Sequence, residues 1–133
     1  MEKKTIRVKD IMRTRFGRID RRETVRTALS MMQDSNARAL IVNKRDEEDE
    51  LGIVVLADIA KLVLARHKSP DRVNVYEIMS KPVIQVTPGM DIRYCARLFD
   101  RFGLERAPVV ENGEILGIVS YHVLVLRGLT QFL

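Results

Sequence analysis

The sequence is poor in the residues that most often carry covalent or metal chemistry. It has no tryptophan, two histidines and one cysteine, Cys95, in 133 residues. A lone thiol forms no internal disulfide and fits a reducing compartment. There is also no Cys-x-x-Cys pair, no Gly-x-Ser-x-Gly elbow and no Walker loop, so the chain offers no nucleophile with an oriented base. These absences predict a protein that is not an enzyme, with Cys95 as a small core side chain.

Long apolar runs are missing as well. The longest, residues 53–65, is interrupted by Asp58 and Lys61, and it falls well short of the ~20 residues that span a bilayer. The charged N-terminus is followed by no apolar segment, which excludes a secretory signal. We therefore expect a cytoplasmic protein without a membrane partner.

The charge is unevenly distributed. The net charge is +5, yet residues 1–26 alone hold ten basic and four acidic side chains, and the rest of the chain carries 13 basic and 14 acidic groups. A basic segment raises the possibility of a nucleic-acid partner. This segment contains only one aromatic residue, Phe16, and no helix-turn-helix or RNA-binding signature follows it. Nucleic acid is therefore the least favoured class of partner.

What the sequence does contain is an internal repeat. The segment 8–12, Val-Lys-Asp-Ile-Met, recurs 67 residues later as Val-Tyr-Glu-Ile-Met at 75–79. Each copy is followed by apolar residues at helical spacing: Val25, Ala28, Leu29 and Met32 in the first, and Ile92, Cys95, Ala96 and Phe99 in the second. Next come a strand at 39–42 or 107–110, a turn, a strand containing Gly-Ile-Val at 52–54 or 117–119, and a closing helix at 58–65 or about 123–129. We expect Asn112-Gly113 to form a tight hairpin turn, and the acidic loop 46–50 to be a solvated turn, since it lacks the alternating spacing of a calcium loop.

The order of these elements predicts a mixed α/β (α+β) fold made of two β-α-β-β-α repeats. We place a basic N-terminal arm at 1–7, the first repeat at 8–66, a polar linker at 67–74, the second repeat at 75–129 and a tail at 130–133. One repeat alone makes a marginal core. The two repeats are therefore expected to pack into one unit.

Two ordered copies of this pattern resemble a tandem pair of CBS (cystathionine β-synthase) domains, also called a Bateman module. The resemblance covers about 8–129 and implies a pseudo-two-fold pair that binds AMP, ADP, ATP or S-adenosylmethionine in the cleft between the repeats. It also implies a homodimer and no obligatory cofactor, and the acidic loop gives no reason to expect a metal. The module would signal to a separate, unidentified effector protein.

The family's ligand signature, Gly-apolar-apolar-(Ser/Thr)-x-x-Asp, is divided between the two copies. The first keeps the ribose-binding acid as Asp58 but has Val55 at the hydroxyl position, whereas the second keeps Ser120 and has Val123 in place of the acid. A carboxylate accepts two hydroxyl donors at once, so the resemblance favours the site at Asp58. Capping of its helix is the alternative role for Asp58.

An arginine precedes the first hairpin strand in each copy, Arg38 in the first and Arg106 in the second. The resemblance places a phosphate-binding cation at this position. The alternative is that both arginines are ordinary solvated charges. Tyr121 and His122 would supply a stacking face, a donor or a dimer contact. The candidate ligand-binding set is Asp58, Val55, Arg38, Ala39, Arg106, Pro108, Ser120, Tyr121, His122 and Arg15. A ligand-free dimerisation or protein-interaction module is the competing function, because neither copy of the signature is complete.

Overall fold

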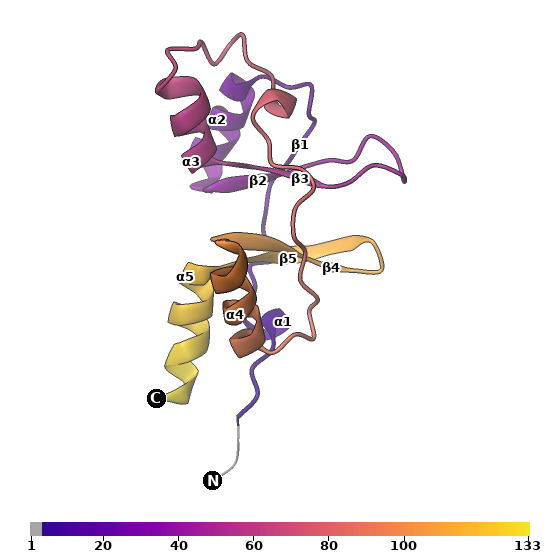
Figure 1. Cartoon of the computed structure of the whole chain (residues 1–133), viewed down its shortest axis with the longest axis vertical. Coiled ribbons are helices and arrows are strands. Elements are labelled where there is room, and N and C mark those ends of the chain that lie inside the picture. Colours follow the sequence, from indigo (N-terminus) through magenta and orange to yellow (C-terminus); the bar gives the residue numbers. More distant parts are fainter. Residues whose placement is uncertain (1–3) are drawn as a thin grey trace. The chain divides into compact units, whose positions relative to one another are not determined.

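Two compact units make up the structure, a computed structural model that describes residues 4–133. The central unit comprises residues 16–83, and the terminal unit combines residues 4–15 with residues 84–133. From residue 4 the chain therefore contributes first to the terminal unit, then builds the central unit and then returns, as the colours of Figure 1 show. No helix in the described part of the chain is long and apolar enough to cross a membrane.

The central unit is a three-stranded sheet covered by two helices, in the predicted β-α-β-β-α order. Strand β2 is the middle strand, parallel to β1 and antiparallel to β3, and both helices lie on the same side of the sheet (Figure 1). The elements are β1 (Arg18–Ile19), α2 (Val25–Ser35), β2 (Ala39–Val42), β3 (Gly52–Val55), α3 (Leu56–Ile59) and a π-helical turn (Ala60–Leu64). The closing helix begins two residues before its predicted start.

The terminal unit repeats this arrangement around the antiparallel hairpin β4–β5. As predicted, Asn112 and Gly113 form its turn, and both have positive φ angles, 52° and 78°. A single parallel bridge between Val86 and Val109 takes the place of a first strand. The elements are α1 (Val8–Ile11), α4 (Ile92–Phe102), β4 (Arg106–Glu111), β5 (Glu114–Ser120), α5 (Tyr121–Val123), a π-helical turn (Leu124–Gly128) and a 3₁₀ turn (Leu129–Phe132).

Helices α2 and α4 begin and end in the same way, 67 residues apart. A side chain caps each first turn: Thr24 accepts from the Thr27 amide at 3.3 Å, and Asp91 accepts from the Arg93 amide at 2.8 Å. Each helix ends at a residue in the left-handed conformation, Asn36 or Gly103. The apolar faces between these caps fill the two cores.

Each unit has its own hydrophobic core. In the terminal unit the core includes Cys95, which is fully buried as expected, and burial raises the pKa of its thiol to about 11. Residues of the predicted N-terminal arm contribute as well: Ile6 is buried in this core, while residues 1–3 of the arm lie outside the described residues. The central core is built by the apolar faces of α2 and β2 together with Val54, Ile59 and Val73.

The repeated Val-x-acid-Ile-Met segments form short capped turns. The Asp10 carboxylate accepts from the Arg7 amide at 2.9 Å, and the Glu77 carboxylate accepts from the Asn74 amide at 2.7 Å. The valine and isoleucine of each segment are buried in a core. The acid position of the repeat therefore serves helix capping.

Each repeated segment packs against a glycine of the opposite repeat. Arg13, next to Met12, forms two backbone hydrogen bonds of 2.9 Å with Ile118, and Ser80, next to Met79, forms bonds of 2.8 and 3.0 Å with Ile53. A side chain would collide with this backbone at Gly117 and would crowd it at Gly52. A Cβ at Gly117 would lie 2.5 Å from the Arg13 oxygen and 3.0 Å from the Met12 sulfur, and one at Gly52 would lie 3.1 Å from the Met79 sulfur.

The compact units therefore differ from the sequence repeats predicted at 8–66 and 75–129. The segment 8–15 packs with the second repeat and the segment 75–83 with the first. The predicted linker, 67–74, is a packed part of the central unit: Val73 is buried and its carbonyl accepts from the Val25 amide at 2.8 Å. Arg26 also forms an ion pair with Asp71 in this stretch. The polar composition of 67–74 concealed this packing.

Replacement of Gly117 by alanine is expected to destabilise the protein by about 1–3 kcal/mol, as overpacking against an immobile neighbour does. Gly52→Ala should cost less, because the nearest atom there belongs to a methionine side chain. Gly89→Ala is the matched control, since nothing lies within 4 Å of a Cβ at that position. Urea denaturation measures all three, and equal stabilities for Gly117→Ala and Gly89→Ala would contradict the role given to this contact.

Candidate functional site

The first candidate site is the corner where β3 passes into α3 in the central unit. Val55 is the N-cap residue and makes no side-chain capping bond, and Asp58 is the third residue of the helix. Asp58 is therefore not the N-cap, and of the alternative role left open by the sequence it keeps the place of an acid in the first turn of the helix. The Asp58 side chain is half-buried, and within residues 4–133 it has no hydrogen bond or ion pair. An acceptor that no protein donor occupies is available to a ligand's hydroxyl groups.

The equivalent corner of the terminal unit, where β5 passes into α5, is built differently. Ser120 is the N-cap, and its hydroxyl accepts from the Val123 amide at 3.2 Å. Val123, at the position of Asp58, is buried in the core. Tyr121 and His122 are both exposed beside the cap. This corner presents a hydroxyl and an aromatic ring, but it has no carboxylate at the position equivalent to Asp58.

The register of the two hairpins corrects one expectation about the arginines. Ala39 lies opposite Val55 in the central unit, whereas Arg106 lies opposite Ser120 in the terminal unit. Val55 and Ser120 hold the same place before their helices, so Arg106 corresponds to Ala39 and not to Arg38. The residue equivalent to Arg38 is Glu105: the Arg38 carbonyl accepts from the Leu56 amide at 3.0 Å, and the Glu105 carbonyl accepts from the Tyr121 amide at 2.9 Å.

A shift of one residue places a side chain on the other face of a strand. Arg38 is exposed, whereas the Arg106 side chain is only 15% exposed and lies 3.9 Å from Glu105. The two arginines are therefore not a repeated pair. The Ala-Leu-Ile-Val and Ala-Pro-Val-Val segments suggested the wrong alignment, while the caps of α2 and α4 show the true spacing of 67 residues.

The structure divides the candidate residues between the two units. Arg38, Ala39, Val55 and Asp58 gather around the start of α3, and Arg106 and Ser120 face each other near the start of α5. Pro108 is buried within β4, and its carbonyl accepts from the Val86 amide at 3.0 Å. That placement is a core position. Arg15 is exposed at the end of the first segment of the terminal unit.

Comparison with known proteins identifies the family to which the chain belongs. A model of the CBS domain matches residues 8–65 and again residues 75–126. The chain belongs to the CBS domain family. It is a small CBS pair, and its mixed α/β fold is that of solved CBS pairs.

Two solved structures and one curated relative illustrate the likeness. A hexameric CBS-CP12 protein from bloom-forming cyanobacteria is 36% identical with a TM-score of 0.90, over 92% of this chain and 71% of that one. A CBS domain pair in complex with 5′-methylthioadenosine and S-adenosylmethionine shares the fold, with 24% identity and a TM-score of 0.81 over 96% of this chain and 99% of that one. An uncharacterised protein from Methanopyrus kandleri is 35% identical over 72% of this chain, which spans only 48% of that relative's length.

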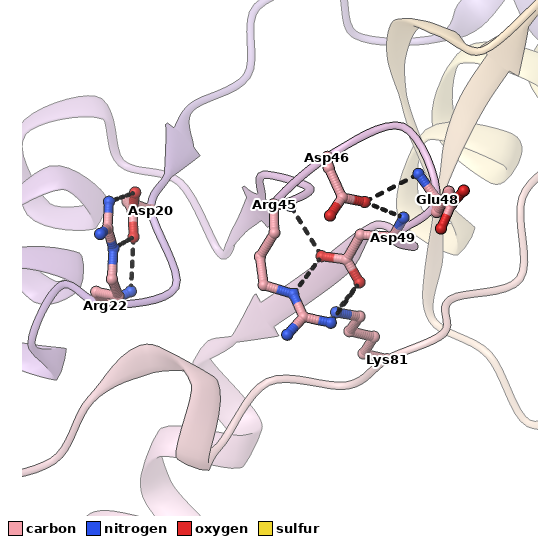
Figure 2. Close-up of polar contacts among 7 residues, drawn as sticks. All are labelled: Asp20, Arg22, Arg45, Asp46, Glu48, Asp49 and Lys81. Atoms are coloured by element: carbon pink, nitrogen blue, oxygen red, sulfur yellow. Dashed lines mark hydrogen bonds and ion pairs between the residues drawn. The ribbon is translucent and has the colours of Figure 1, made fainter.

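The acidic loop of the CBS pair contains a feature that the sequence pattern did not indicate. Asp49 lies in the loop between β2 and β3, and its side chain is only 4% exposed. As Figure 2 shows, its carboxylate pairs with Lys81 and accepts from the Arg45 amide at 2.8 Å and from Arg45 Nε at 3.2 Å. The Lys81 ammonium, followed by the Arg45 amide, holds the pKa of Asp49 well below its usual range.

The rest of the loop is ordered by its own turn. The Asp46 carboxylate accepts from the amides of Glu48 and Asp49 at 2.9 and 3.0 Å (Figure 2). Over residues 4–133 no cluster of histidine, cysteine or acidic side chains has the geometry to hold a metal ion. Local charge density alone could not reveal Asp49, because its partner Lys81 lies 32 positions further along the chain.

Replacement of Asp49 by asparagine is expected to lower Tm at neutral pH and to flatten its dependence on acid. The folded-state pKa lies below the unfolded value of about 3.9, so the pair's contribution is complete above that value and is lost as the pH falls toward the folded pKa. Melting curves between neutral pH and about pH 2 measure the difference. Glu47→Gln, an exposed change in the same loop, is the control; an acid profile of Asp49→Asn that matches wild type would contradict this account.

Proposed function

We propose that this CBS pair is a non-enzymatic regulatory module that binds an adenosine ligand at the Asp58 corner and signals to a separate protein. The observation that carries the proposal is the half-buried Asp58 carboxylate. It stands at the family's ribose-binding position and has no hydrogen-bond or ion-pair partner among the described residues. A carboxylate takes both hydroxyls of a ribose diol, since it has two oxygens and only accepts.

The neighbouring residues support a ligand at this corner. Ala39 and Val55 lie opposite each other at the end of the β2–β3 strand pair, so the residues that precede the helix of Asp58 are apolar. Arg38, whose carbonyl is tied to the first amide of α3, carries an exposed guanidinium that suits a phosphate group. The fold itself accommodates such ligands, because a CBS pair of the same fold has been solved with 5′-methylthioadenosine and S-adenosylmethionine.

Asp58→Ala is expected to weaken adenosine-ligand binding about tenfold or more, the cost of two lost hydrogen bonds to a charged acceptor. Thermal-shift screening of AMP, ADP, ATP and S-adenosylmethionine identifies the ligand, which at a hundred times its Kd stabilises the fold by about 2.7 kcal/mol. Val55→Ser completes the signature Gly-Ile-Val-Ser-x-x-Asp in the first copy and should tighten binding of a phosphorylated ligand. If none of the four compounds raises Tm at millimolar concentration, the proposed function is rejected.

Self-association is the second part of the proposal, and an exposed apolar strip supports it. Tyr121, Val125, Leu126 and Leu129 lie on α5 and the turns that continue it, and each is between 46 and 58% exposed. Apolar side chains concentrated on one element mark contact surfaces. We propose that this strip packs against a second copy of the chain. The ligand-free interaction module, the competing function, would use the same strip.

Leu126→Glu is expected to shift the protein toward smaller species by placing a charge within the contact. Light scattering coupled to size exclusion measures the mass, with circular dichroism to verify folding. Ile84→Glu changes an exposed apolar residue outside the strip and should leave the mass of wild type. A monomeric wild type, or equal effects of the two substitutions, would rule out this contact.

A further inference from the structure

Helix α4 presents a row of three arginines that the proposed function does not use. Arg93, Arg97 and Arg101 are spaced four residues apart and all are exposed. Residues at this spacing are neighbours on a helix surface, and like charges there repel. Over residues 4–133, none of the three takes part in an ion pair.

The arginines are held by aromatic rings instead of carboxylates. Arg93 lies over the ring of Phe132, 4.2 Å from its centroid, and Arg97 lies 5.9 Å from the ring centroid of Tyr94. Such contacts orient a guanidinium while leaving its charge unneutralised. The side chains are thus positioned to meet an anion.

The second unit of the same chain supplies an internal comparison. At the equivalent positions, 67 residues earlier, α2 carries Arg26, Ser30 and Asp34. The one arginine of this set is neutralised by an ion pair with Asp71. The fold therefore does not require a cationic face on this helix, and the charge on α4 is particular to the terminal unit.

A surface hollow of about 590 Å³ adjoins the first two arginines. Its volume falls within the range of small-molecule sites. The lining holds two guanidinium groups, those of Arg93 and Arg97, and one carboxylate, that of Asp91, so its net formal charge is positive. The Asp91 carboxylate caps α4 by accepting from the Arg93 amide at 2.8 Å. The lining residues are Thr5, Thr87, Gly89, Met90, Asp91, Arg93, Tyr94 and Arg97.

We propose that this hollow binds a phosphorylated small molecule, at a site separate from the Asp58 corner. Arg93 and Arg97, one helical turn apart, hold the phosphate, since guanidinium groups match its oxygens in charge and geometry. The hydroxyls of Thr5 and Thr87 add neutral donors, and the half-exposed ring of Tyr94 gives a flat surface to the rest of the ligand. Arg101 is on the same face of α4 but outside the hollow.

Titration of the full chain by NMR or calorimetry tests the site, with ADP, ribose 5-phosphate and inorganic pyrophosphate as probes. The three probes distinguish a nucleotide, a sugar phosphate and a bare polyanion as the source of the phosphate. Arg93→Gln and Arg97→Gln should each weaken binding about tenfold, the loss of one charge-assisted contact. Arg101→Gln, the matched control, should leave the affinity for all three probes within about twofold of wild type. Asp58→Ala is compared with pyrophosphate alone, because this probe has no ribose for the Asp58 corner to hold, and its affinity should also stay within about twofold.

Each other outcome overturns the proposal. An equal loss in Arg97→Gln and Arg101→Gln would mean diffuse attraction to a charged helix, and no saturable binding of any probe at millimolar concentration would mean no site. Binding that is lost in Asp58→Ala and kept in Arg97→Gln would place the ligand at the Asp58 corner, which supports the proposed function and rejects the second site. Pyrophosphate binding that is lost in Arg97→Gln and kept in Asp58→Ala is the result that we expect.

Discussion

The structure depends on one close approach, in which the backbone after a repeated methionine lies directly against a strand glycine. At Gly117 the nearest atom to an added Cβ is the Arg13 carbonyl oxygen, and at Gly52 the Met79 sulfur and the Ser80 oxygen fill the same space. At Gly117 an added Cβ would require the paired backbones to move apart, and at Gly52 it would crowd them. Since each methionine and its glycine come from opposite repeats, the contact decides which segments share a core.

The first turns of α3 and α5, which follow the strands that contain these glycines, carry side chains of different chemistry. In the central unit, Asp58 remains without a protein partner among the described residues, and the adjoining strand pair is apolar. In the terminal unit, Ser120 caps its helix, Val123 belongs to the core and Arg106 lies across the strand pair. A duplicated fold thus keeps its backbone while the side chains at equivalent positions diverge. The same holds for α2 and α4, whose exposed faces differ in charge.

The sequence predicted those parts of the structure that depend on local patterns. Helical spacing located α2 and α4, and the Asn112-Gly113 pair located the second hairpin turn, because caps, apolar faces and turn residues act over a few positions. The pairing of Arg38 with Arg106 was wrong because similar strand sequences invite a shift of one residue, and the hairpin register that exposes the shift is a tertiary property. Asp49 was missed for the same reason, since its ion pair with Lys81 joins distant parts of the chain.

The exchange of segments between the repeats has a consequence for how the protein is made. The ribosome delivers residues 16–83 as one stretch, so the central unit has all its parts when residue 83 leaves the exit tunnel. The segment before residue 16 has no partner until residues 84–133 follow. During that interval the apolar side chains of Ile6, Val8 and Ile11 have no core to enter, and exposed apolar surface of this kind attracts chaperones or other nascent chains. Any fragment cut at the border between the repeats would leave both units incomplete.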